Sequence, residues 1–205
     1  MRILIPSLPI AVLLALPLSG CASRSVVESE QERVRDAARR HVEAYRTQDW
    51  ARVLRRTWPP LVEEMGGHRE ALAAMEAAAK EADRAYSIVQ FTVPPMSEFY
   101  FGDDRMFAVV PVALRTLRNN VLVDVTTFQL GILPRGERTW TFVDGGMFPP
   151  DRLVEMFPDL PPGARLPRVQ SRVRGPATEE LLKQYREAAE ETRRPPRAGR
   201  PAHRR

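Results

Sequence analysis

A second cysteine is absent from this chain, because Cys21 is the only one among its 205 residues. No disulfide can therefore form within the chain, and stability has to come from packing. Lysine is nearly absent too, with two residues against 29 arginines. Histidine occurs only as His41, His68 and His203, without closely paired acidic residues. The sequence therefore predicts no metal site.

The motifs of common enzyme and nucleotide-binding sites are also absent. The chain has no GxSxG, HExxH, P-loop or dinucleotide-binding fingerprint. Gly66-Gly67 and Gly145-Gly146 lack the lysine and the helix start of a phosphate-binding loop, and we interpret both pairs as turns. The sequence predicts no cofactor, favours a binding role over catalysis, and leaves the question of an enzyme open.

The positive charge is concentrated at one end of the chain. Residues 192–205 hold six arginines and no acidic residue, and Arg2 carries the only charge before Arg24. Removing Arg2 and these six arginines from the formal net charge of +5 leaves −2 for residues 3–191. The predicted folded part is nearly neutral, so no nucleic-acid partner is expected. For the basic tail, binding to an anionic surface and an unselected disordered end are equally open.

Residues 1–20 have the composition of an export signal: a basic start, an apolar run and a small-residue end. Pro6, Pro9 and Pro17 interrupt the apolar run. A membrane-spanning helix needs about 20 apolar residues, and three prolines disfavour a helix of that length. We therefore predict a signal peptide that is removed from the mature protein.

The end of this segment, Leu18-Ser19-Gly20-Cys21, resembles the lipobox of bacterial lipoproteins. The resemblance implies cleavage between Gly20 and Cys21, diacylglyceryl transfer to the Cys21 sulfur, and acylation of the new amino terminus. Two or three acyl chains hold a protein stably in a bilayer, whereas one chain binds only marginally. An ordinary signal with a coincidental cysteine is the alternative. A catalytic thiol is disfavoured, because no histidine lies near Cys21 in the sequence.

The implied location is the cell envelope, with the lipid bilayer as a partner through acylated Cys21. Ala22, rather than an aspartate, follows the cysteine. This resembles lipoproteins that are sorted to the outer membrane. In a Gram-negative source, the protein is therefore expected on the outer membrane, facing the periplasm.

Three helices are predicted in the first part of the mature chain. Apolar residues recur at helical spacing over Gln31–Arg46. Asp49 is a suitable N-cap for a short second helix, Trp50–Arg56, which ends before two prolines. The third helix, about His68–Ala85, is rich in alanines that would allow close approach to a sheet.

The residues after Tyr86 alternate between β-rich segments and turns. The expected strands are Ser87–Val93, Ser97–Phe101, Arg105–Thr116, Val121–Leu133 and Glu137–Val143. Two of them are long, which indicates a curved sheet. Three helices followed by consecutive antiparallel strands predict an α+β domain with the helices on one face of the sheet.

The sequence thus divides into six parts. These are a lipoprotein signal peptide (1–20), a tether (21–30), the α+β domain (31–160), a proline- and arginine-rich linker (161–177), a helix (178–192) and a disordered basic tail (193–205).

The order of elements resembles the nuclear transport factor 2-like (NTF2-like) superfamily, which includes ketosteroid isomerase and scytalone dehydratase. The resemblance covers about residues 31–160. It is carried by TQDWARVLRRTWP, by the helix start GGHREAL, and by RTWTFVDGG at the end of the last strand. It implies a cone of three N-terminal helices packed on one curved antiparallel sheet, with a small-ligand pocket. Domains of this kind often form homodimers through the exposed face of the sheet.

Asp124 lies within the predicted strand VLVDVTTF, where an acidic residue is unexpected. In ketosteroid isomerase a pocket carboxylate acts as the base. One hypothesis therefore makes Asp124 the base of a lyase or isomerase, with Tyr45, Tyr86 or Tyr100 as a hydrogen-bond donor. His41 lies beside the apolar stripe of the first helix, and the tentative pocket contains Asp124, Tyr100 and His41. Strand alternation favours a different interpretation, in which Val123 and Val125 point inward and Asp124 points to solvent.

Two functional hypotheses follow. The first is a lipid-anchored, non-catalytic module that binds a small ligand or an envelope protein. The second is a ketosteroid-isomerase-like enzyme that uses Asp124 and a tyrosine. The first is favoured, because the chain contains the lipobox and no reaction motif.

Overall fold

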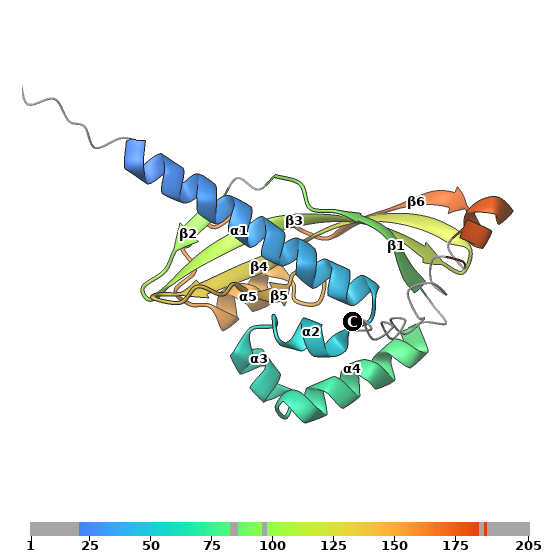
Figure 1. Ribbon diagram of the computed structural model, residues 1–205, viewed down its shortest axis with the longest axis horizontal. Helices are drawn as coiled ribbons and strands as arrows, with labels where there is room; N and C mark the ends of the chain where they lie inside the picture. Colours follow the sequence, from blue (N-terminus) through green and yellow to red (C-terminus); the bar gives the residue numbers. More distant parts are fainter. Residues whose placement is uncertain (1–20, 83–85, 96–97, 185–186, 188–205) are drawn as a thin grey trace, which may run out of the picture.

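The computed structural model describes residues 21–82, 86–95, 98–184 and 187, which form an α+β fold (Figure 1). The α+β class predicted from the sequence is confirmed. The helices are α1 (Cys21–Arg46), α2 (Trp50–Leu54), α3 (Pro59–Glu64), α4 (His68–Ala82) and α5 (Pro150–Met156). The strands are β1 (Tyr86–Thr92), β2 (Phe99–Phe101), β3 (Arg105–Arg118), β4 (Val121–Pro134), β5 (Thr141–Asp144) and β6 (Gln170–Pro176). The predicted signal peptide and basic tail lie outside the described residues.

The sheet is open and antiparallel, and it is built on two long strands. β3 and β4 have 14 residues each and pair along their whole length without a shift in register. β1 and β2 both pair with the edge of β3 that is not paired with β4. β5 and β6 both pair with the opposite edge of β4. Asn119 and Asn120 close the β3–β4 hairpin with φ angles of 49° and 63°. A two-residue hairpin turn of this kind needs positive φ at both positions, which asparagine tolerates.

Different elements cover the two faces of the sheet. Successive side chains of a strand point to opposite faces. On β3, Ala108 and Val110 therefore face α1, whereas Phe107 and Val109 face α5. We call these the inner face and the outer face. The inner cluster contains Val34, Ala37, Ala38, Val93, Ala108, Val110, Leu133, Trp140 and Phe142. The outer cluster contains Phe107, Val109, Phe128, Leu130, Ile132, Val143, Leu153, Phe157 and Leu160.

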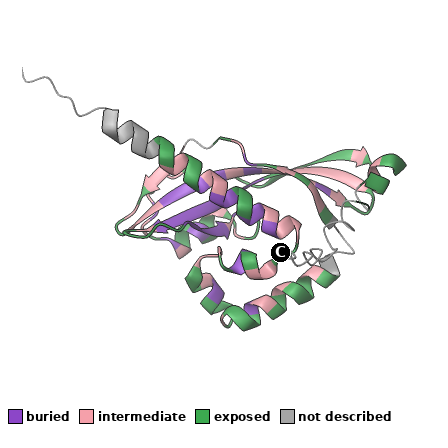
Figure 2. Cartoon of the chain, viewed as in Figure 1, coloured by how far each residue is buried: buried purple, intermediate pink, exposed green. Residues whose placement is uncertain are grey.

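Burial is concentrated at the end of the sheet that carries β2 and β5 (Figure 2). There, helices cover both faces and the central residues of β3 and β4 are buried. At the other end, beside β1 and β6, most residues of the two long strands are only half-buried. The hydrophobic core therefore lies under α1 and α5, and the β3–β4 hairpin extends away from it.

Helix α1 begins at Cys21, earlier than the predicted start at Gln31. The residues between them include no proline or glycine, so the helical conformation can extend through them. Its central part packs closely on the sheet. A Cβ atom at Gly131 would lie 3.1 Å from Val34 and 3.2 Å from Trp140. A glycine on β4 thus allows the helix to approach the strand.

Helices α2, α3 and α4 pack on one another beside the sheet. Asp49 caps α2 as predicted, because its side chain accepts the backbone N–H of Arg52 at 3.0 Å. Pro59 begins α3, in agreement with the tolerance of proline in a first helical turn. The apolar residues of α4, including Leu72 and Met75, pack on α2 and α3. The expected close approach of this helix to the sheet is therefore replaced by helix–helix packing.

Residues 161–177, predicted to be a linker, instead contain strand β6. β6 pairs with Val121–Thr126 of β4. Its sequence signal is weak, since it is largely exposed, contains two arginines and a glycine, and ends at a proline. Thr178 follows it and begins the predicted C-terminal helix, accepting the backbone N–H of Leu181 at 3.3 Å. The described part of the chain contains no helix that is long and apolar enough to cross a bilayer.

Candidate functional site

The structure does not bring Asp124, Tyr100 and His41 together. Asp124 lies on the outer face, where it pairs with Arg115 near the β3–β4 turn. Tyr100 pairs with Phe107 at the opposite end of β3. His41 lies on α1 and packs on Phe142, a residue of the inner face. No shared pocket is formed from these three side chains.

Asp124 is held between two arginines. Its carboxylate accepts hydrogen bonds from Arg115 Nε at 2.8 Å and from Arg174 Nε at 2.5 Å. These two bonds lower the pKa of Asp124 to about 2. A carboxylate that binds a proton so weakly is a poor general base near neutral pH. Its contacts instead connect β3, β4 and β6.

We predict that Asp124→Asn weakens the attachment of β6. The change removes the charge that holds Arg115 and Arg174, so amide hydrogen exchange in β6 should become faster while exchange in β5 stays unchanged. The lowered pKa means that this ion pair stabilises the folded state above about pH 4 and is lost as the pH falls toward 2. Glu137→Gln, in an exposed turn, is the control. Equal exchange in β6 of the wild type and Asp124→Asn would contradict the prediction.

Tyr100 connects β2 to the segment that follows α5. Its hydroxyl donates to the carboxylate of Glu98 and accepts the backbone N–H of Arg165, the latter at 2.8 Å. Burial, followed by the hydrogen bond to Glu98, raises the pKa of Tyr100. The hydroxyl is therefore engaged on both sides by the protein itself.

His41 is buried between α1 and the inner face. Its ring centroid lies 5.2 Å from that of Phe142 and 5.1 Å from that of Tyr45. Burial, and to a smaller extent the charge of Arg56, lowers the pKa of His41 to about 3. The imidazole is therefore neutral at physiological pH. Its Nδ1 atom is buried and has no hydrogen-bond partner among the described residues.

Two further buried polar side chains on the inner face lack a partner. Thr127 and Gln129 lie two residues apart on β4, so they point to the same side of the sheet as Gly131 beneath α1. Thr127 Oγ1 and Gln129 Oε1 have no hydrogen bond within the described part of the chain. The exposed fractions of His41, Thr127 and Gln129 are 2%, 7% and 3%.

Asp144 completes this group, because it pairs with Gln129 across the β4–β5 ladder. Its carboxylate accepts the backbone N–H of Gly146 at 2.7 Å. Burial raises the pKa of Asp144, and the hydrogen bond from Gly146 partly opposes this shift. Phe142, on which His41 packs, is the neighbouring residue of β5 on the same face. We call His41, Thr127, Gln129 and Asp144 the inner polar cluster.

Comparisons with known proteins do not assign this cluster. The chain matches no family model, no curated protein and no solved structure. The geometry of the cluster is therefore the basis for assigning a role to it.

Three side chains of the inner polar cluster, His41, Thr127 and Gln129, are uncharged at neutral pH. Gln129 Oε1 can only accept, whereas the Thr127 hydroxyl can donate and accept. His41 Nδ1 donates or accepts according to its tautomer. No group of three histidine, cysteine, aspartate or glutamate side chains that could hold a metal ion occurs within the described ranges. The cluster thus presents both donors and acceptors of hydrogen bonds.

Sequence reasoning identified His41 but missed Thr127, Gln129 and Asp144. The sequence signal for Thr127 and Gln129 lay in the same strand as Asp124, a few residues after it. The alternation that directs Val123 and Val125 inward also directs Thr127 and Gln129 inward. Two polar residues at core-facing positions of a strand are unusual and mark a candidate site.

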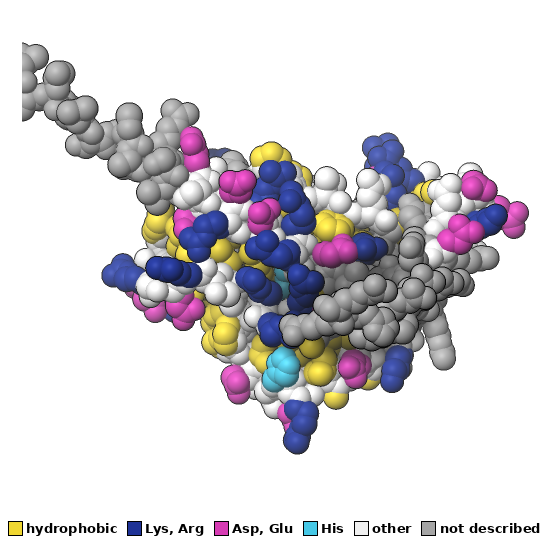
Figure 3. Space-filling view, viewed as in Figure 1, with side chains coloured by type: hydrophobic (Ala, Val, Ile, Leu, Met, Phe, Trp, Pro, Cys, Tyr) yellow, Lys and Arg dark blue, Asp and Glu magenta, His cyan; other side chains and the backbone are white. Residues whose placement is uncertain are grey.

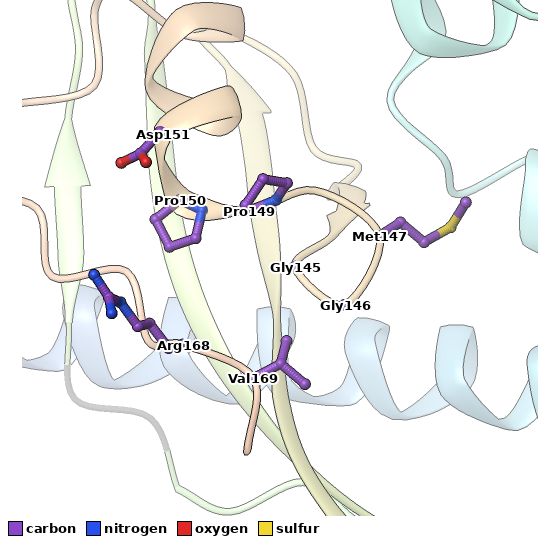
Figure 4. Close-up of a pocket in the computed structure, with 8 residues that line it drawn as sticks. All are labelled: Gly145, Gly146, Met147, Pro149, Pro150, Asp151, Arg168 and Val169. Atoms are coloured by element: carbon purple, nitrogen blue, oxygen red, sulfur yellow. The ribbon is translucent and has the colours of Figure 1, made fainter. Parts of the chain in front are cut away.

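A hollow lies beside the β5–α5 turn on the molecular surface (Figure 4). It has a volume of about 380 Å³. Arg168 and Val169 line it from the segment before β6, and Pro150 and Asp151 line it from the start of α5. The remaining lining residues are Gly145, Gly146, Met147 and Pro149. This hollow is open to solvent and contains none of the buried polar atoms of the inner polar cluster.

Proposed function

We propose that this protein is a lipid-anchored envelope lipoprotein whose domain, an NTF2-like cone, binds a small polar ligand without catalysing a reaction. The described fold, an α+β domain with an antiparallel sheet, is compatible with such a cone. One observation supports the binding role above all: three buried side chains on one side of the sheet each have a polar atom without a described partner. Membrane attachment is proposed from the lipobox-like sequence that ends at Cys21.

The three polar atoms without a described partner lower the stability of the folded protein. A buried polar group without a hydrogen bond destabilises the folded state by about 1–3 kcal/mol. Buried polar atoms in native proteins are therefore almost always hydrogen-bonded to protein or to ordered water, and a bound ligand can supply the same bonds. A ligand that donates to Gln129 Oε1 and bonds to Thr127 and His41 would remove this cost. The ligand class is a small molecule with several uncharged donors and acceptors, such as a polyol or an amide.

The test compares two buried threonines of the inner face, Thr127 and Thr116. Thr116 Oγ1 donates to the backbone C=O of Val123 at 3.2 Å, whereas Thr127 Oγ1 has no described partner. Thr127→Val should raise the free energy of unfolding by about 1 kcal/mol, because it removes an unpaired buried hydroxyl. Thr116→Val should lower it by about 1 kcal/mol, because it removes a hydrogen bond. Urea denaturation of the ligand-free protein measures both.

Binding of the small molecule is measured in a separate experiment. Native mass spectrometry of the protein purified from its own membranes should show a bound small molecule that is lost in Thr127→Val and retained in Thr116→Val. If Thr127→Val lowers stability as much as Thr116→Val, the hydroxyl serves the fold and the binding proposal fails. A protein that never carries or takes up a small molecule would also contradict it.

The lipid anchor has its own prediction. Cys21→Ser should abolish the incorporation of labelled fatty acid, because serine has no thiol to accept the diacylglyceryl group. Ala22→Gly is the matched control next to it and should leave the labelling unchanged. Labelling of Cys21→Ser at the wild-type level would contradict lipid attachment at this residue.

A further inference from the structure

Four arginines form a basic surface where α1 meets α2. Arg52 lies in α2, Arg55 is the C-cap of this helix, and Arg56 follows in the next turn. Arg40 lies on α1, one turn before Ala44, whose carbonyl accepts the N–H of Asp49 at 2.9 Å. Basic side chains gather over this part of α1 and α2 in the space-filling view (Figure 3). We call Arg40, Arg52, Arg55 and Arg56 the arginine surface.

Within the described residues, the four arginines of this surface lack the acidic partners that three other arginines of α1 have. Elsewhere on α1, arginines form ion pairs with acids three residues away: Arg33 with Glu30, Arg39 with Asp36, and Arg46 with Glu43. Among the described residues, no carboxylate oxygen lies within 4.0 Å of a side-chain nitrogen of the four arginines. The carboxylate of the adjacent Asp49 is bonded to the backbone N–H of Arg52.

Arg56 is the fixed centre of this surface. Its backbone carbonyl accepts the N–H of Phe142 at 2.7 Å, which joins it to the edge of β5. Its side chain is half-buried. Burial, followed by the charges of Arg40, Arg52 and Arg55, lowers the pKa of Arg56. The guanidinium groups of Arg40, Arg52 and Arg55 therefore repel that of Arg56, and an anion placed among them would relieve this repulsion.

We propose that the arginine surface binds a phosphate group. A single carboxylate would neutralise one of four charges, whereas a phosphate dianion carries up to two charges and presents several oxygens. Each guanidinium can donate two parallel N–H bonds to such oxygens. Soluble phosphate compounds and lipid headgroups share this chemistry. The arginine surface shares no residue with the inner polar cluster, so the proposal does not depend on the proposed function.

The experiment is a calorimetric titration of the detergent-solubilised, full-length protein with inorganic phosphate at low ionic strength. Arg40→Gln or Arg56→Gln should weaken binding by about tenfold or more, because each removes a charged hydrogen bond. Arg39→Gln is the matched control, since it removes the same charge from the neighbouring position on α1. It should weaken binding by less than about twofold, because exposed charges further away are screened.

Two further titrants identify the form of the phosphate. Tighter binding of inorganic phosphate than of glycerophosphoglycerol, a soluble phosphodiester headgroup, supports a free phosphate compound as the ligand. The reverse order supports a lipid headgroup. Acetate should bind more weakly than both. Absence of binding by either phosphate probe, acetate binding as tightly as phosphate, or equal weakening by Arg39→Gln and Arg40→Gln would overturn the proposal. Circular dichroism checks that each variant is folded.

Discussion

Acidification from pH 7 to pH 4 should lower the free energy of unfolding by about 3 kcal/mol through His41 alone. Its pKa falls from an ordinary value of 6.5 to about 3 in the folded protein. Between these two values the unfolded chain binds the proton and the folded chain does not. Protons therefore favour the unfolded state over this range. The stability is fully present above about pH 6.5 and decreases by about 1.4 kcal/mol per pH unit below it.

The measurement is urea denaturation at a series of pH values, with tryptophan fluorescence as the probe of unfolding. His41→Leu places an apolar side chain that cannot bind a proton against Phe142 and Tyr45. It should therefore remove this pH dependence between pH 6.5 and 4. His68→Gln, at an exposed position at the start of α4, is the matched control and should retain it. An unchanged pH dependence in His41→Leu would show that other groups cause the loss of stability.

Replacement of Gly145 by alanine should destabilise the protein by about 3 kcal/mol, because the added methyl group overpacks the core. Its Cβ atom would lie within 2.6 Å of three atoms of the Phe128 ring, which is fully buried on the outer face. The backbone cannot move away easily, since Gly145 N–H donates to the Phe128 carbonyl at 2.9 Å. Thermal or urea denaturation measures the loss.

The control for this substitution is Gly163→Ala. A Cβ atom at Gly163 would meet no atom within 4 Å. This change should alter the free energy of unfolding by less than about 0.5 kcal/mol. In a Phe128→Leu background, Gly145→Ala should cost at least about 1 kcal/mol less than in the wild type, because leucine lacks the outer ring atoms. If the effects of Gly145→Ala and Phe128→Leu on the free energy of unfolding simply add in the double variant, the clash with Phe128 is not the cause of the destabilisation.

The sequence predicted the elements whose signals are local. The apolar spacing of α1 indicated the face that buries Val34 and Ala38, and Asp49 marked the start of α2. The long strands β3 and β4 were found from their β-rich composition. These features depend on neighbours within a few residues, so one sequence is sufficient to recognise them.

β6 and the environment of α4 could not be predicted in the same way. β6 is an exposed edge strand whose pairing with β4 includes the contact of Arg174 with Asp124, 50 residues earlier in the chain. Residues 56–58 join the segment between α2 and α3 to the edge of β5, and α4 packs on both helices. Both outcomes depend on partners that are distant in sequence.

The candidate site likewise combines features that the sequence predicts with features that depend on long-range packing. Strand alternation alone assigns Thr127 and Gln129 to one face and Asp124 to the other, because side-chain direction follows from the extended backbone. The sequence by itself determined the α+β class, this alternation and the lipobox-like segment at Cys21. Only the tertiary structure decided that α1 packs on the face of Thr127 and Gln129, that these two side chains have buried polar atoms, and that His41 on α1 is neutral. Burial and the pKa values that it changes depend on which element covers a face, and that choice is made by long-range packing.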